Sequence, residues 1–108
     1  MRIWDLDPGK ICNNHLLGEH RELHAIWSII LNNKKGYMNH PEVKRWRGKL
    51  KALYSRHDLL VKEMDRRGFK HSSPLDKKLA KGKSKQDVLI DSLKDQKRIL
   101  REKDCLCK

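Results

Sequence analysis

The sequence lacks any long hydrophobic run, and its longest apolar stretch, residues 25–31, is interrupted by Ser28. A helix that spans a bilayer needs about 20 apolar residues, and residues 1–5 do not begin the apolar stretch of a signal peptide. These absences predict a cytoplasmic protein that does not enter a membrane. Aromatic residues make up only 6% of the chain, so the core of these 108 residues must be mainly aliphatic.

Cysteine is scarce and is not spaced for disulfide or metal chemistry. The chain has three cysteines, an odd number; Cys105 and Cys107 are separated by one residue, and Cys12 stands alone. No CxxC pair is present to suggest a zinc site. We therefore expect reduced cysteines, no metal and no cofactor.

Acidic residues are few relative to basic ones: 14 Asp and Glu stand against 26 Lys and Arg, a net charge of +12. Residues 1–33 carry three basic and four acidic residues, a net −1, whereas residues 34–71 carry +8 and residues 72–108 carry +5. An excess of this size predicts a nucleic-acid partner held through its phosphates rather than its bases. The structural alternative is a solvated basic surface that binds nothing.

The apolar residues recur every three or four positions, and no strand pattern competes with this helical period. The length fits one domain. We predict an all-α fold: a compact single domain over residues 1–108, with three main helices and an extended amino-terminal segment. The predicted helices span residues 13–33, 41–67 and 84–103, the last capped by Ser84 with Asp87, and residues 71–85 are predicted to be a basic loop or arm.

Six basic side chains of the second predicted helix lie off its apolar stripe. The first five are expected to contact DNA phosphates. In order, the six are Lys44, Arg45, Arg47, Lys49, Lys51 and Arg56.

The first predicted helix carries most of the residues with potential chemistry. At 100° per residue, Glu22, His15 and Glu19 share one flank of its apolar stripe. Gly18 and Ala25 border them with almost no side chain, which leaves a shallow gap beside Glu22 for a backbone or a sugar.

His20 and His24 lie on the opposite flank, one turn apart, as a pair that can bind a metal. The sequence from His20 to His24 superficially resembles the zinc protease motif, but that motif needs a glutamate directly after the first histidine. Here Glu22 is two residues after it and points about 160° away from the histidine edge. We expect no catalytic metal and two partly buried or phosphate-facing histidines.

Several motifs together resemble the pyrimidine-dimer DNA glycosylases, the family of bacteriophage endonuclease V. The likeness is strongest over residues 1–23. The residues that carry it are Arg2-Ile3, His15-Leu16, Glu19, Arg21-Glu22-Leu23, Lys49-Leu50, Leu53, Arg56 and Arg66-Arg67-Gly68-Phe69.

The resemblance implies a nucleophile that is the α-amino group of the chain, attacking the sugar C1′ under a damaged base. Met1 occupies that position, because the bulky Arg2 disfavours removal of the methionine. Glu22 matches the assisting glutamate, Arg2 and Arg21 match arginines that grip phosphates, and His15 matches a histidine of the DNA-binding surface. The base leaves, an imine forms, and β-elimination cuts the strand.

The substrate implied is damaged double-stranded DNA, bound by a monomer that associates with the nucleoid. The family pattern has an arginine where this chain has His24-Ala25, and an aromatic-basic tail where this chain has residues 104–108. These departures leave the preferred lesion open between pyrimidine dimers and abasic sites. Two other functions also stay open: a non-catalytic basic helical DNA-binding protein, and a metal-dependent nuclease that uses His20, His24 and a carboxylate.

Overall fold

The computed structural model describes residues 3–69, 75, 77–86 and 92–102 of the chain. Within them the secondary structure is helical, which confirms the all-α prediction; three helices have ten or more residues. None of the helices described is both long and apolar enough to cross a bilayer. The elements are η1 (Pro8–Lys10), α1 (Asn13–Leu31), η2 (Lys35–Tyr37), α2 (Pro41–Trp46), α3 (Leu50–Arg66), η3 (Lys77–Leu79) and α4 (Leu93–Glu102).

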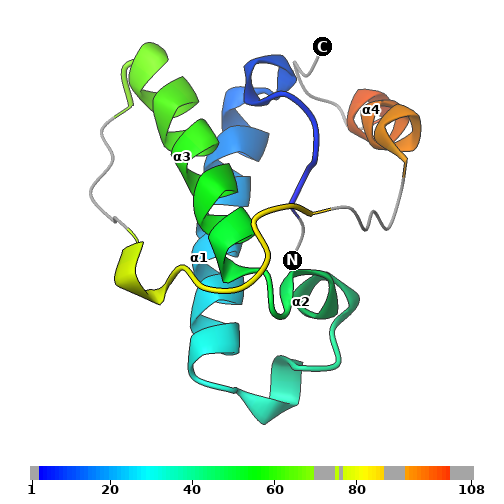
Figure 1. Cartoon of the computed structure of the whole chain (residues 1–108). Coiled ribbons are helices and arrows are strands. Elements are labelled where there is room, and N and C mark those ends of the chain that lie inside the picture. Colours follow the sequence, from blue (N-terminus) through cyan, green and yellow to red (C-terminus); the bar gives the residue numbers. More distant parts are fainter. Residues whose placement is uncertain (1–2, 70–74, 76, 87–91, 103–108) are drawn as a thin grey trace.

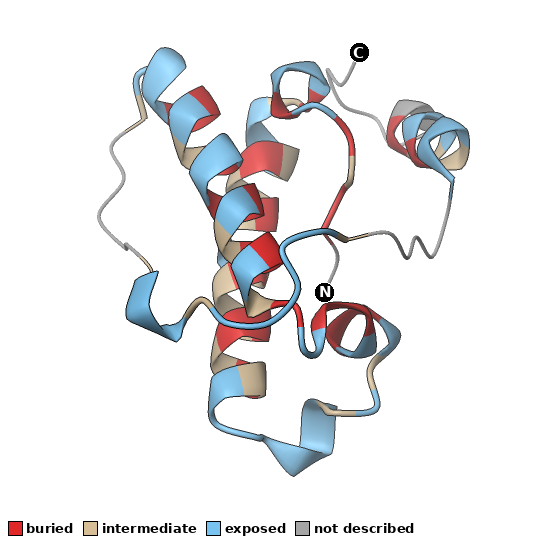
Figure 2. Cartoon of the chain, in the orientation of Figure 1, coloured by how far each residue is buried: buried red, intermediate tan, exposed pale blue. Residues whose placement is uncertain are grey.

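Helices α1 and α3 pack along each other and form the centre of the fold (Figure 1). Their buried residues lie on the sides that face each other and the extended amino-terminal segment (Figure 2). Leu16, Leu23 and Ile26 of α1 meet Leu53 and Leu60 of α3 in one cluster, and all five side chains are fully buried. The amino-terminal segment, α2 and Leu100 of α4 complete this core.

Helix α1 begins at the predicted residue, Asn13, and ends at Leu31, two residues before the predicted end. The end is local in origin, because Asn33 adopts a left-handed backbone with φ +48°. Asparagine tolerates that conformation better than most residues. Leu31, at the helix end, is exposed, whereas Ile29 is buried in the core.

The second predicted helix is divided in two, which corrects the prediction of one helix over residues 41–67. Helix α2 begins at Pro41 as expected and ends at Trp46; α3 begins at Leu50. Gly48 lies between them with φ +74°, in the left-handed region that favours glycine. A Cβ built on Gly82 would lie 2.2 Å from the Gly48 carbonyl oxygen, so the two backbones can approach this closely only because Gly82 has no side chain.

Residues 77–86, which include most of the described part of the predicted loop 71–85, lie across the beginning of α3. The amide of Lys51 donates to the carbonyl of Lys81 at 3.0 Å, and that of Ala52 donates to Lys83 at 3.1 Å. The first amides of a helix have no partner within it, so this segment supplies acceptors that the α3 sequence lacks.

The third helix starts later than predicted, which corrects the start at Ser84. Ser84 is not helical, and α4 begins at Leu93, where the Ser92 hydroxyl accepts from the Asp95 amide at 3.1 Å. Asp87, the other member of the predicted capping box, lies outside the described residues.

Candidate functional site

The extended amino-terminal segment, residues 3–6, is held by buried polar side chains that contact its backbone. Glu19 of α1 accepts the Trp4 amide at 3.1 Å. Arg56 of α3 donates through Nη1 to the Leu6 carbonyl at 2.8 Å, and through Nε and Nη2 to the Glu19 carboxylate at 2.7 and 3.1 Å. The Glu19–Arg56 ion pair thus joins α1, α3 and the amino-terminal segment at one point.

A second buried pair, from α2, holds the segment nearer its beginning. Glu42 Oε1 accepts from the Ile3 amide at 3.4 Å and from Trp46 Nε1 at 2.9 Å. Arg45 donates to Glu42 Oε1 at 2.6 Å, to the Ile3 carbonyl at 3.1 Å and to Asp5 Oδ2 at 2.6 Å. Both charged groups of this pair thus have hydrogen-bond partners within the protein, as a buried charge requires.

Helix α4 adds the last contact to the segment. Gln96 is 1% exposed; its Oε1 accepts the Asp5 amide at 2.8 Å and its Nε2 donates to Asp5 Oδ2 at 3.1 Å. We call Glu19, Glu42, Arg45, Arg56 and Gln96 the anchoring side chains. They come from four different helices and contact four consecutive residues of the amino-terminal segment.

The electrostatics of Glu19 follow from its position. Burial raises the pKa of Glu19 above its ordinary value, and the charge and hydrogen bonds of Arg56 oppose that rise. The guanidinium thus offsets part of the effect that burial has on the pKa of this carboxyl.

Glu22, the predicted catalytic glutamate, lies one turn after Glu19 on α1 and is half-buried. The amino-terminal segment runs antiparallel to α1 (Figure 1), and its Trp4 amide contacts Glu19, one turn before Glu22. Glu22 lies three helical residues after Glu19, which is a rise of about 4.5 Å along α1. The three residues before Trp4 can span at most about 10 Å, so their length is sufficient to cover that rise. Met1 and Arg2 lie outside the described residues.

His15 lies against the same segment. Its ring packs edge-on against Trp4 with the centroids 6.1 Å apart, and its Nδ1 is 3.0 Å from the Cys12 sulfur. The structure therefore brings His15 to the amino-terminal segment, whereas Arg21 projects from α1 as an exposed side chain.

The six basic residues of the second predicted helix separate into two groups. Lys44, Arg47 and Lys51 are exposed, as a phosphate-binding face requires. The other three are buried, so the prediction of an exposed basic face is wrong for Arg45, Lys49 and Arg56.

Two physical reasons account for this difference. The break around Gly48 changes the angle between residues before and after it, so one continuous helical wheel does not describe both helices. The buried cations also have partners inside the protein: Lys49 Nζ donates to Gln86 Oε1 at 2.7 Å, Arg45 Nη1 to Asp5 Oδ2 at 2.6 Å, and Arg56 Nε to Glu19 Oε2 at 2.7 Å.

Sequence reasoning missed the anchoring role of Glu19, Glu42 and Gln96. A signal existed for Glu19, whose helical angle lies only 60° from that of Leu16, the most central apolar position of α1. For Glu42, the position in the first turn of α2 indicates only a favourable contact with the helix dipole. Gln96 has no local signal, because its partner Asp5 is 91 residues away in the chain.

Comparison with known families gives one match: a family model described as pyrimidine dimer DNA glycosylase matches residues 1–77. The match includes the amino-terminal segment, α1, α2, α3 and four of the five anchoring side chains. Searches of curated proteins and of solved structures gave no match. Because the family model matches well over half of the 108 residues, this chain belongs to the pyrimidine dimer DNA glycosylase family.

Proposed function

We propose that this DNA glycosylase also cleaves the strand at the damaged site, and that its nucleophile is the α-amino group of Met1. The lone pair of that nitrogen attacks the sugar C1′ while the bond between C1′ and the base breaks, and the electron pair of that bond leaves with the base. Loss of a proton from the nitrogen and opening of the sugar ring give an imine. Removal of a C2′ proton then expels the 3′ phosphate by β-elimination.

The observation that carries this proposal is the anchoring of the amino-terminal segment to α1 through Glu19, one turn before Glu22. Backbone contacts at each of residues 3–6 fix the course of the chain. Such fixing supports catalysis, because a reacting group held in place loses little entropy on reaching the transition state. Glu19, which holds the Trp4 amide, lies one turn before Glu22 on α1, which supports an amine and a carboxylate acting on one sugar.

The two groups have complementary chemistry. An α-amine has a pKa of about 7.7–8.0, whereas a lysine amine has one of about 10.4, so the terminus supplies far more neutral amine at physiological pH. A net charge of +12 favours the neutral form further. A carboxylate at Glu22 stabilises the cationic sugar and accepts the C2′ proton. This chemistry requires no cofactor and no catalytic metal.

We further propose that exposed basic residues hold the duplex by its phosphates. Lys44, Arg47 and Lys51 are exposed on α2, the break and α3, and Arg21 is exposed on α1 near Glu22. The 77–86 segment extends this surface, because its backbone bonds to the Lys51 amide. Arg2 and His15 are assigned to the same surface beside the reacting sugar. A monomer carries the whole site.

Borohydride trapping tests the proposal. Duplexes containing a single thymine dimer or abasic site are incubated with the protein and borohydride, and the adduct is mapped by peptide mass spectrometry. A covalent adduct on Met1 is expected. Glu22→Gln is expected to lower adduct formation by about 10²–10⁴-fold, the usual contribution of an acid–base group, while damaged-DNA binding stays within about threefold of wild type.

Asp58→Asn is the matched control, because Asp58 is an exposed carboxylate on α3. It is expected to keep wild-type trapping. An adduct on an internal lysine would contradict the role of Met1. Binding of damaged DNA with no adduct would instead indicate a non-catalytic DNA-binding protein, and strand cleavage without an adduct would indicate a metal-dependent nuclease.

A further inference from the structure

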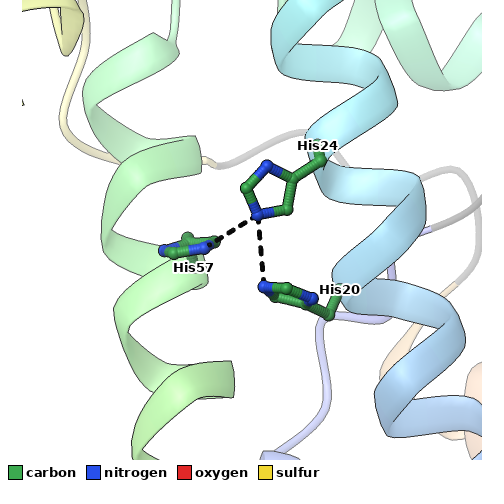
Figure 3. Close-up of side chains that lie close together, drawn as sticks. All are labelled: His20, His24 and His57. Atoms are coloured by element: carbon green, nitrogen blue, oxygen red, sulfur yellow. Dashed lines mark hydrogen bonds between the residues drawn. The ribbon is translucent and has the colours of Figure 1, made fainter. Parts of the chain in front are cut away.

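Three histidines come together between α1 and α3 (Figure 3). His20 and His24 are one turn apart on α1, and His57 of α3 faces them. The His24 Nε2 lies 3.2 Å from the His20 Nε2 and 3.2 Å from the His57 Nε2. We call these three residues the histidine cluster.

Hydrogen bonds between neutral rings cannot satisfy both contacts of the His24 Nε2 at once. A neutral imidazole nitrogen carries either one proton or one lone pair. The His24 Nε2 therefore has one proton or one lone pair to share between two neighbouring Nε2 atoms. A cation placed among the three nitrogens would be contacted by a lone pair of each ring.

The distances fit a metal ion. Two nitrogens bound to one tetrahedral zinc, at about 2.0–2.1 Å each, are about 3.3 Å apart. Two of the three nitrogen pairs are separated by 3.2 Å, and ligand atoms of all three residues lie within 4.8 Å of one another. His57 is only 3% exposed, so its ring is held by the surrounding core rather than by solvent.

We propose that the histidine cluster binds one zinc ion, with a water molecule in the fourth position. Imidazole nitrogens in tetrahedral geometry are typical zinc ligands. The third ligand could not be recognised from the local motif, because His57 is 33 residues from His24 in the chain.

The role of this ion is to join α1 to α3. Glu22 lies on the opposite flank of α1 from His20 and His24, so the ion does not take part in the proposed amine chemistry. An ion that binds the folded state and not the unfolded state stabilises the folded state by mass action. The site is therefore independent of the glycosylase proposal, and each can fail without the other.

The test uses the full chain without an affinity tag, with its three cysteines replaced by serine so that no thiolate can bind metal. Protein expressed with added zinc is analysed for metal content, and metal-free protein is titrated with ZnCl₂ by calorimetry. We expect one zinc per chain. Co²⁺ is expected to give the visible bands of a tetrahedral nitrogen site, without a thiolate charge-transfer band.

His57→Gln, and separately His20→Gln, are expected to weaken zinc binding by more than about 100-fold, since loss of an outer-shell partner already costs 10–100-fold. His40→Asn is the matched control. The His40 Nδ1 accepts the Glu42 amide at the start of α2, a capping role that asparagine can also fill. This control and Glu22→Gln are both expected to retain full zinc binding.

Thermal unfolding gives a second readout. At a hundredfold excess of zinc over its Kd, the Tm of the unsubstituted cluster is expected to rise by roughly 10 °C, and that of the His57→Gln protein is expected not to rise. If folded, metal-free protein takes up no zinc, that result alone overturns the proposal, and no variant of the histidine cluster is needed. Unchanged affinity in both cluster variants would overturn it as well, by placing the ion elsewhere.

Discussion

Replacing Arg56 with methionine removes the guanidinium that joins α1, α3 and the amino-terminal segment. Arg56 is 9% exposed and Glu19 is 2% exposed, so neither group is compensated by bulk water. The change deletes two hydrogen bonds to Glu19, at 2.7 and 3.1 Å, and one to the Leu6 carbonyl at 2.8 Å. Removing one partner of a buried ion pair costs about 3–5 kcal/mol.

That loss is large against the total stability of a small domain, about 5–15 kcal/mol. Urea unfolding, followed by circular dichroism and by fluorescence of the buried tryptophans, measures this loss of unfolding free energy directly, and thermal unfolding measures the change in Tm. The Tm is expected to fall by at least about 12 °C, at about 4 °C per kcal/mol. The double variant Arg56→Met with Glu19→Gln is expected to be more stable than the sum of the two single changes predicts, because it leaves no buried charge.

The pH dependence adds a signature specific to Glu19. Burial raises its pKa and Arg56 opposes the rise, so Arg56→Met is expected to raise the pKa further. A carboxyl whose pKa is higher in the folded state binds its proton more tightly there. The stability of Arg56→Met is therefore expected to fall as pH rises above the ordinary value of 4.5 and through the raised pKa.

The variant also bears on function, because Arg56 holds the segment that leads to Met1. Borohydride adduct formation by folded Arg56→Met is expected to fall, whereas the control Asp58→Asn keeps it. A loss of stability below about 1 kcal/mol, the range of an exposed ion pair, would refute the reasoning. It would mean that the pair exchanges freely with water and does not fix the segment.

Three further changes test other parts of the structure. Gly82→Ala is expected to cost at least about 2 kcal/mol of unfolding free energy, because it places a side chain at φ +91° and against backbone, whereas Gly36→Ala meets nothing within 4 Å and should be near neutral. Hydrogen bonding from Arg66 lowers the pKa of Glu63 below 4.5, so the stabilisation is present above that pH and lost as pH falls through the lowered pKa. In an acid titration, the difference in unfolding free energy between wild type and Glu63→Gln should therefore shrink as pH falls through the lowered pKa. A difference that stays constant would contradict this prediction. Arg47→Ala is expected to reduce the salt dependence of DNA binding by about one unit of slope, similarly for all sequences, and an unchanged slope would remove Arg47 from the interface.

The boundaries that local sequence controls were predicted well. Helix α1 begins at Asn13, and α2 begins at Pro41 with the acidic Glu42 in its first turn, as proline and dipole preferences indicate. The break at Gly48 and the late start of α4 were missed. The break depends on the approach of Gly82, 34 residues away, which no periodicity within α2 or α3 can report.

The net charge of the chain predicted a nucleic-acid partner, whereas the positions of the basic residues in the sequence did not predict which of them are buried. The net +12 and the family motifs indicated a DNA-binding repair protein, and membership of that family is confirmed over residues 1–77. Which cations face solvent did not follow from the pattern. Arg45 and Arg56 are buried because carboxylates from distant positions, Asp5 and Glu19, neutralise them inside the fold.

The sequence by itself determined the all-α class and the family, because these depend on local periodicity and on short motifs near the amino terminus. Tertiary structure alone decided which polar groups are buried, since burial depends on partners that lie up to 91 residues apart. Tertiary structure also formed the histidine cluster, because packing brings His57 of α3 to His20 and His24. The local sequence of α1 supplies only two of the three histidines. The sequence of a helix determines which residues share a face, but only tertiary packing determines what that face contacts.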